Sequence, residues 1–229
     1  MQFFVPPNYL RNDSTDLHSR VFEPGSLLDW EEALIQGKET PNVLPTELVE
    51  GFSLWEFDRP CVVLGRGSKE EEANESNCKR DGVPVVRRCS GGATILAGPG
   101  CLMYSVVLSL QQRPELRSIN AAHRFVMTKI QSATQEIEAR VELQGICDLC
   151  IDGRKFSGNA LRYKRDWLLY HGTILYDFPV EMLGHYLNDP ARQPAYREGR
   201  SHEDFLTNIH ADREQLSQLL CQHWDVRMP

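Results

Sequence analysis

Apolar residues along the chain recur in short runs between turn-forming residues, a pattern typical of a sheet with a few helices. Runs rich in β-branched and aromatic residues predict strands. These runs lie at 52–67 (two strands broken at Arg59-Pro60), 83–88, 101–110, 139–145, 148–158 and 167–178. The run 83–88 is expected to be a buried strand that leads into a glycine-rich loop.

Helices are predicted where apolar residues recur at helical spacing or where cap residues flank the segment. They cover 26–37 with Ser26 as N-cap, 118–137, 182–186 and 211–224. The segment 73–82, which ends at Gly82, is interpreted as either helical or irregular. Strands joined by short turns, with helices at either end, indicate an α+β architecture. A βαβ dinucleotide-binding unit is disfavoured, because the residues after the glycine-rich loop predict a strand.

The length and composition fit one soluble domain over residues 1–229, without a second C-terminal domain. The net charge of −7 argues against general nucleic-acid binding. No apolar run approaches the ~20 residues that span a bilayer, and the N-terminus lacks a secretory pattern. The seven cysteines do not suggest a disulfide framework, which indicates reduced thiols and a cytoplasmic location.

The first segment with candidate chemistry is RRCSGGATILAGPG, residues 87–100. Small residues leave backbone N–H groups accessible there, beside the positive charges of Arg87 and Arg88. Such backbone commonly cradles an anion, usually phosphate. The segment matches neither GxxxxGK[ST] nor GxGxxG, so it predicts no standard nucleotide motif.

The second segment is IDGRKFSGNALR, residues 151–162. Asp152-Gly153 predicts a hairpin turn. Lys155 follows the turn and precedes Ser157-Gly158, where its side chain could point into a cleft beside bare backbone. Strand alternation would place Arg154 on the opposite face. A solvated surface lysine is the ordinary alternative.

The third segment, LLYHGTILY at residues 168–176, interrupts an apolar strand with His171, Gly172 and Thr173. A functional histidine and a structural histidine at a β-bulge remain equally open. Cys147 and Cys150 form a CxxC pair, but a zinc site needs a second pair of ligands at matching spacing. These two cysteines are therefore interpreted as strand packing residues.

In order and spacing, RRCSGGA, GICD, GRKFSGNA and HGTIL resemble the motifs of the lipoate-protein ligase A family. That family belongs to the biotin and lipoate protein ligase superfamily, and the resemblance covers roughly residues 20 to 210. Three departures stand out. Ala93 occupies the place of a third glycine, Ala97-Gly98 that of a His-Asp pair, and Cys101 that of an asparagine.

The resemblance implies a biotin/lipoate ligase-like (class II synthetase-like) catalytic domain, with a mixed, largely antiparallel sheet flanked by helices. It also implies lipoate-protein ligation, in which lipoate and ATP give lipoyl-adenylate and the acyl group then passes to a lysine of an acceptor domain. Lys155 would be catalytic, bridging the acyl carboxylate and the α-phosphate. Asp148 would hold Mg²⁺. Apolar strands around Val85 and Leu108 would form a tunnel for the acyl chain.

The resemblance also implies two sets of binding residues, with Arg87 and Ser90 supporting the loop. The ATP set is Arg88, Ala93, Thr94, Ile95, Leu96 and Lys155. The lipoate set is Arg87, Ser90, Gly91, Gly92, Lys155, Ser157, Gly158, His171, Gly172 and Thr173.

The expected partners are lipoyl-acceptor proteins, namely E2 lipoyl domains or the glycine cleavage H protein, with no nucleic acid or membrane. A separate accessory chain is possible on the same resemblance. One alternative is a cysteine-dependent octanoyl or lipoyl transferase, for which Cys89 and Cys101 in the loop are the candidate thiols. The other is a non-catalytic homologue that binds an acyl-adenylate or a lipoyl domain.

Overall fold

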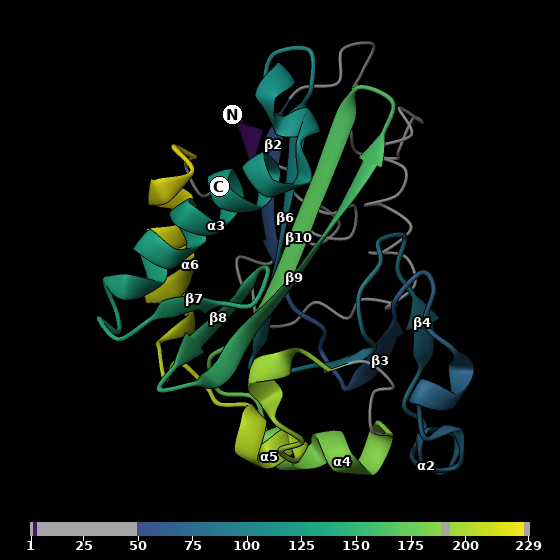
Figure 1. Ribbon diagram of the computed structural model, residues 1–229. Helices are drawn as coiled ribbons and strands as arrows, with labels where there is room; N and C mark the ends of the chain where they lie inside the picture. Colours follow the sequence, from purple (N-terminus) through teal and green to yellow (C-terminus); the bar gives the residue numbers. More distant parts are fainter. Residues whose placement is uncertain (1, 4–49, 189–192, 227–229) are drawn as a thin grey trace, which may run out of the picture.

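A seven-stranded sheet forms the centre of the computed structural model, which describes residues 2–3, 50–188 and 193–226 (Figure 1). The spatial order is β1-β2-β6-β10-β9-β8-β7. Only the pair β1–β2 is parallel. The strands are β1 (Gln2–Phe3), β2 (Gly51–Trp55), β6 (Cys101–Ser109), β7 (Glu142–Gln144), β8 (Asp148–Ile151), β9 (Arg154–Lys164) and β10 (Trp167–Leu175).

A second, three-stranded sheet has the order β4-β3-β5. It consists of β3 (Cys61–Leu64), β4 (Val85–Arg87) and β5 (Ile95–Ala97). The glycine-rich loop connects β4 to β5, so the small sheet holds both ends of that loop.

Two helices, α3 (Ile119–Gln135) and α6 (Arg213–His223), cover one face of the large sheet (Figure 1). Strand alternation sends Leu102, Tyr104 and Val106 of β6 into the core beneath these helices. Ser118 caps α3 by accepting a hydrogen bond from the N–H of Ala121.

A second core lies toward the opposite face, between the large sheet and the small one. Met103 of β6, Val62 of β3 and Leu96 of β5 belong to it, as do side chains of α4 (Leu183–Tyr186). The remaining helices are α2 (Glu75–Asp81) and α5 (His202–Phe205), with 3₁₀ turns η2 (Glu70–Glu72), η3 (Pro114–Arg117), η4 (Val180–Met182) and η5 (Ala195–Arg197). Helix α4 and the small sheet that holds the glycine-rich loop thus meet beside the large sheet.

The predicted α+β class and largely antiparallel sheet are confirmed, and most predicted elements are found. Helix α2 ends before Gly82, which has the left-handed conformation (φ 68°) that suits glycine. The predicted helix over 26–37 lies outside the described residues. In the described part of the chain, no helix is both long and apolar enough to cross a membrane.

Three expectations differ from the structure. β4 is not buried: it is an edge strand on which Val85 is 40% exposed. The region 148–158 is two strands joined at Asp152-Gly153, as the turn signal itself indicated. β5 was missed because Ile95–Ala97 is only three residues long and follows a run of small residues.

Gly100 offers a test of how the two sheets are joined. Its φ is +86°, and an added Cβ would lie 2.2 Å from the carbonyl oxygen of Asp177. Both effects oppose a side chain, so Gly100→Ala should lower the free energy of unfolding by about 2–4 kcal/mol. Gly184→Ala in α4 is the control, because an added Cβ there meets nothing within 4 Å. Urea denaturation measures both; equal stabilities would contradict the packing of this turn.

Candidate active site

Two neighbouring pockets share one wall beside β9 and β10. The residues common to both are Ala93, Ile95, Lys155, Gly158 and Thr173. The larger pocket extends toward α4 and α5, and the smaller one extends toward β3 and the start of the glycine-rich loop. Lys155 is the one cationic side chain common to the two pockets, so a charged group from either pocket can approach the same ammonium.

The linings differ in character. The larger pocket is mostly apolar, with a few polar side chains at its edge; besides the shared wall it contains Glu72, Thr94, Leu96, Phe156, Ser157, Leu175, Phe178, Leu183, Leu187, Asn188, Pro194, Arg197, His202, Phe205 and Leu206. The smaller pocket adds Val63, Arg88, Gly92, Met103, Asn159, Ala160, His171 and Gly172. Pockets of this kind, apolar with a few convergent polar groups, are typical ligand sites.

A break in the β8–β9 register points Lys155 into the site. Leu149 pairs with Ser157, whereas the next residue, Cys150, pairs with Lys155, so β9 has one extra residue at Phe156. Strict alternation would place Lys155 on the face of Ser157. The irregularity instead brings its side chain over Gly158, where an added Cβ would lie 2.8 Å from Lys155 Cε and 2.9 Å from Nζ.

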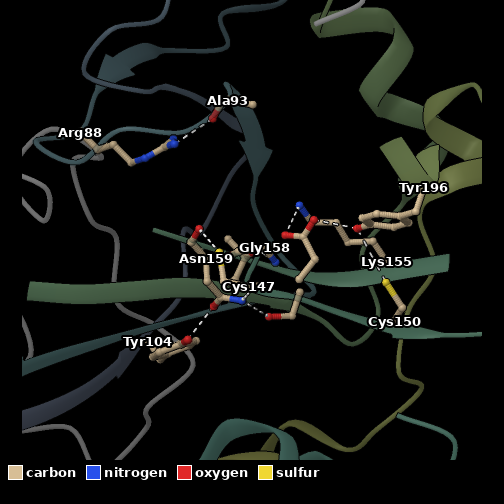
Figure 2. Close-up of polar contacts among 12 residues, drawn as sticks. Arg88, Ala93, Tyr104, Cys147, Cys150, Lys155, Gly158, Asn159 and Tyr196 are labelled. Atoms are coloured by element: carbon tan, nitrogen blue, oxygen red, sulfur yellow. Dashed lines mark hydrogen bonds and ion pairs between the residues drawn. The ribbon is translucent and has the colours of Figure 1, made fainter. Parts of the chain in front are cut away.

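Lys155 is held by an ion pair with Asp148. Its Nζ lies 2.8 Å from Asp148 Oδ1, and the two side chains are 24% and 15% exposed. The phenol of Tyr196 donates a hydrogen bond of 2.7 Å to the other oxygen, Asp148 Oδ2 (Figure 2). The ammonium therefore has a defined position at the wall between the two pockets.

Arg88 organises the glycine-rich loop from within. Its guanidinium donates to the carbonyls of Val63 (3.2 Å), Gly91 (2.8 Å) and Ala93 (2.8 Å), and to Ser90 Oγ (3.1 Å). The side chain is 7% exposed and lines the smaller pocket rather than the larger one. Five fixed N–H donors suit arginine to bind several carbonyls at once. Arg88 thus shapes the loop in this structure (Figure 2).

Arg87 supports the same loop from outside. Its Nη1 donates to the carbonyls of Gly65 and Ser68, at 2.8 and 2.7 Å. Gly65 needs to be glycine because an added Cβ would lie 2.1 Å from the carbonyl oxygen of Gly92. Arg87 therefore holds the 65–68 turn, which packs against the glycine-rich loop that Arg88 holds.

Glu72 closes the loop against η2. Its Oε2 accepts hydrogen bonds from the hydroxyl (2.6 Å) and the backbone N–H (3.3 Å) of Thr94. Burial raises the pKa of Glu72, but the hydrogen bonds from Thr94, Ser68 and Lys69 outweigh it and hold the pKa below its ordinary value. The Thr94 N–H is therefore already engaged, and a carboxylate borders the larger pocket.

His171 lines the smaller pocket and is 5% exposed. Its Nε2 lies 2.5 Å from Ser90 Oγ, so the histidine links β10 to the glycine-rich loop. The register of β10 with both neighbours runs through His171 without interruption, so no β-bulge is present there. The alternative of a structural histidine at a β-bulge is therefore wrong about the bulge.

Asn159 joins the site to the core beneath α3. It accepts from the Tyr104 hydroxyl at 2.5 Å and donates to the carbonyl of Cys147 at 2.6 Å (Figure 2). Gly172 leaves room for this side chain, since an added Cβ would lie 1.8 Å from Asn159 Oδ1. The floor of the smaller pocket is therefore tightly packed.

All seven cysteines lie in the described residues, and all are buried thiols outside disulfides. Burial raises the pKa of Cys61 to about 12 and that of Cys147, Cys150 and Cys221 to about 11. Burial also raises the pKa of Cys101 and Cys78 above the ordinary range. Among these six thiols, none has the lowered pKa of a nucleophilic cysteine.

Asp148 fits Mg²⁺ poorly in this arrangement. Both of its carboxylate oxygens are engaged, by Lys155 and Tyr196. Within the described residues no group of three His, Cys, Asp or Glu side chains comes together as a metal site. A magnesium ion on Asp148 would have to displace the lysine.

The structure brings most of the predicted site residues together, from three separate segments. Those in the pocket walls are Arg88, Gly92, Ala93, Thr94, Ile95, Leu96, Lys155, Ser157, Gly158, His171, Gly172 and Thr173. Arg87, Ser90, Gly91 and Asp148 are adjacent but line neither pocket. Val85 and Leu108 do not form the predicted tunnel, since β4 is an edge strand and Leu108 lies in the core beneath α3.

Several residues of the site were missed. Glu72 lies in an acidic run that looks like solvated surface, and Arg197 and Tyr196 lie in a segment predicted only as helices and loops. Of these missed residues, Asn159 could have been found from the sequence, because it directly follows the Ser157-Gly158 pair. Arg154, expected on the face opposite to Lys155, donates to the carbonyls of Glu203 and Leu206.

Comparison with known proteins gives the family. Residues 24–220 match the lipoyl protein ligase A/B catalytic domain, and the chain belongs to that family. The lipoate-protein ligase LplJ of Bacillus subtilis is 29% identical over 131 residues, which are 57% of this chain and 38% of LplJ. The octanoyltransferase LipM of Oceanobacillus iheyensis is 27% identical over 199 residues, 80% of this chain and 71% of LipM. The chain spans less than half the length of LplJ and of other lipoate-protein ligases that it matches.

Solved structures share the fold. A lipoate-protein ligase A bound with ATP superposes with a TM-score of 0.67 and 18% identity, covering 89% of this chain and 81% of that one. A bi-partite lipoate protein ligase from Thermoplasma acidophilum, described with its E2 lipoyl domain, gives a TM-score of 0.68 and 18% identity. That match covers 88% of this chain and 79% of the other. The predicted family and ligase-like fold are thus confirmed.

The burial of the cysteines gives a direct test. At about pH 8, a thiol with a pKa of about 11 is only about one part in a thousand thiolate. Iodoacetamide should therefore label Cys147, Cys150 and Cys221 in the folded protein at least tenfold more slowly than in urea, because burial and the raised pKa both oppose reaction. Mass spectrometry of timed samples measures this. Rapid labelling of one native cysteine would contradict the structure and favour a thiol-dependent transferase.

Proposed function

We propose that the chain is the catalytic part of a lipoate-protein ligase that activates lipoate with ATP and transfers the acyl group to an acceptor lysine. The observation that carries the proposal is the position of Lys155 on the wall shared by two pockets. A reaction between a carboxylate and a phosphate is favoured when a cation offsets the repulsion between the two anions, and each pocket can present one of them to Lys155.

The two pockets suit the two substrates differently. In this proposal the smaller pocket receives the acyl chain, because Val63, Met103 and Ala160 give it apolar walls near His171. The larger pocket receives the nucleotide, with Phe178 and Phe205 available to its base. The Glu72 carboxylate would repel phosphates, so the phosphate end is expected toward Lys155. Support for ATP comes from the ATP-bound structure with the same fold.

The chemistry would proceed in two steps, an adenylyl transfer to the carboxylate followed by an acyl transfer to the amine. A carboxylate oxygen attacks the α-phosphorus, the new P–O bond replaces the bond to the β-phosphate oxygen, and pyrophosphate leaves. The acceptor amine then attacks the acyl carbonyl, the amide bond forms, AMP leaves and the amine loses a proton. The Lys155 ammonium faces the negative charge that builds up in both steps, and a preorganised charge stabilises such transition states.

The other expected binding residues keep supporting roles in this proposal. Ala93, Thr94, Ile95 and Leu96 would form one wall of the nucleotide pocket. Gly92, Gly158 and Gly172 would line the acyl pocket, where they leave room for the side chains of Arg88, Lys155 and Asn159. Arg87, Arg88 and Ser90 would hold the loop that separates the substrates. Mg²⁺ would enter with the nucleotide phosphates, which supply most of the oxygen ligands that this ion prefers.

The acceptor is proposed to be a lipoyl domain, as in the bi-partite enzyme described with its E2 lipoyl domain. The glycine cleavage H protein is a second candidate acceptor, and a separate accessory chain could complete the enzyme. A cytoplasmic location suits such partners.

The similarity to LipM favours a second candidate, an acyl transferase that needs no ATP. Such an enzyme requires a reactive thiol. The raised pKa values of Cys101, Cys147 and Cys150 weigh against it. A homologue that binds an acyl-adenylate without turnover would have the same pockets. Only an activity assay would distinguish it from a ligase.

One experiment distinguishes these candidates. The protein is incubated with ATP, Mg²⁺, lipoate and a purified lipoyl domain, and the acceptor is weighed by mass spectrometry. The proposal predicts a gain of one lipoyl group that disappears when ATP is omitted. Modification from an octanoylated carrier without ATP would identify a transferase. No modification with tight adenylate binding would identify the binding homologue.

Replacing Lys155 tests its role within that reaction. Lys155→Ala should lower the rate of acceptor modification by about 10²–10³-fold, the usual loss on removing a preorganised charge. Lys155→Arg should restore little, because a planar guanidinium does not reproduce a compact ammonium. Lys164→Ala, on the same strand, is the control. Arg154 is unsuitable, since it contacts the segment after α5. Near-normal activity of Lys155→Ala would remove the proposed mechanism.

Gly158→Ala displaces the ammonium without deleting it. The new methyl would overlap the end of the Lys155 side chain, which can move, so stability should change by less than about 1 kcal/mol. Misplacing the cation should nevertheless slow the reaction by about 100-fold. Gly67→Ala, where an added Cβ meets nothing within 4 Å, is the control. Unchanged activity in a well-folded Gly158→Ala protein would show that the close contact of Lys155 with Gly158 is not required.

A further inference from the structure

The Tyr196 phenol is a polar group next to the candidate active site that the proposed reaction does not use. It belongs to η5 and donates to Asp148 Oδ2 at 2.7 Å, while Asp148 Oδ1 lies 2.8 Å from Lys155 Nζ. Asp148 therefore links the Tyr196 phenol to the Lys155 ammonium; Figure 2 shows Tyr196 and Lys155. Tyr196 does not itself line either pocket.

The direction of each bond follows from the chemistry of the groups. Burial, followed by the hydrogen bond to Asp148, raises the pKa of Tyr196 well above its ordinary value, so the phenol keeps its proton and acts as donor. A carboxylate can rotate about its Cβ–Cγ bond. When the phenol engages one oxygen, that rotation is fixed, and the other oxygen faces Lys155. A charge-assisted hydrogen bond of this length is stronger than a neutral one.

The ring of Tyr196 is itself held in place. It packs against Phe205 with 5.2 Å between ring centroids, and an added Cβ on Gly145 would lie 3.3 Å from its Cε1. The Arg200 guanidinium donates to the Tyr196 carbonyl at 2.7 Å. Arg197, the residue after Tyr196, lines the larger pocket. The phenol therefore connects the wall of that pocket to the lysine.

We propose that Tyr196 is a positioning residue for Lys155 and acts through Asp148. The role rests on the proposed function, because it gives Lys155 its position for the reaction. In this view Asp148 binds the lysine rather than a metal ion. The segment 195–206 fixes the position of the Lys155 side chain and also lines the larger pocket. Tyr196 touches neither substrate.

The first experiment uses Tyr196→Phe in the full chain, which keeps the ring and removes only the hydroxyl. The kcat of lipoate-dependent pyrophosphate release should fall about tenfold, in line with the loss of a hydrogen bond to a charged group. The KM values for ATP and lipoate should stay within about threefold, since the phenol contacts neither substrate. Tyr176→Phe is the matched control, because that phenol also donates to a carboxylate, Glu56, at 3.0 Å. A normal kcat for Tyr196→Phe would overturn the proposal.

A double-mutant cycle separates positioning from general stabilisation. In an Asp148→Asn background the line of contacts is already changed, so adding Tyr196→Phe should lower kcat by less than about twofold. A full, independent tenfold loss in that background would show that Tyr196 acts by another route and would contradict the proposal.

A second measurement needs no activity. The ammonium signal of Lys155 is identified by its absence from the spectrum of Lys155→Arg. It is then followed by ¹⁵N NMR at mildly acidic pH and low temperature. Its protons should exchange with water about tenfold faster in Tyr196→Phe than in the wild type, because the ion pair is less well held. Unchanged exchange would overturn the proposal. If the wild type releases no pyrophosphate, the proposed function fails, yet this exchange rate still decides the role of Tyr196.

Discussion

The site depends on the placement of one ammonium group near the start of strand β9. Lys155 lies on β9, and regular alternation would turn its side chain toward the helix-covered face. The extra residue at Phe156 redirects it, and the missing side chain of Gly158 makes room for it. Asp148 then provides the opposite charge at 2.8 Å. The bulge, the glycine and the carboxylate act on the same atom, and none of them alone would fix its position.

The glycine-rich loop forms the opposite wall under a related constraint. A loop of small residues has little to hold it, and here its carbonyls converge on the buried guanidinium of Arg88. Ser90 adds a link to His171 across the sheet, and Glu72 fixes Thr94 from the other side. The loop is thereby preorganised, so less conformational entropy would be lost when a ligand binds. The contacts from Arg88 engage loop carbonyls, whereas the contact of Thr94 with Glu72 takes up a loop N–H that could otherwise face phosphate.

Local patterns in the sequence were sufficient for much of the fold. Strand runs, the Asp152-Gly153 turn and the caps of α2 and α3 are set by neighbouring residues, and all are found. The exposed position of β4 could not be predicted, because an edge strand and a central strand can share one composition. Lys155 and the glycines were predicted through their motif. Tyr196 and Glu72 were not, since their roles depend on contacts between residues 48 and 22 positions apart in the chain.

The central claim is that Lys155 joins two substrates held in separate pockets. A crystal structure with a stable sulfamoyl analogue of lipoyl-adenylate tests it most directly. The acyl chain should lie in the smaller pocket beside His171 and the adenosine in the larger one beside Phe178. Lys155 Nζ should be within hydrogen-bonding distance of both the acyl carbonyl and the linking group. An analogue bound in one pocket alone, with Lys155 still paired only to Asp148, would contradict the claim.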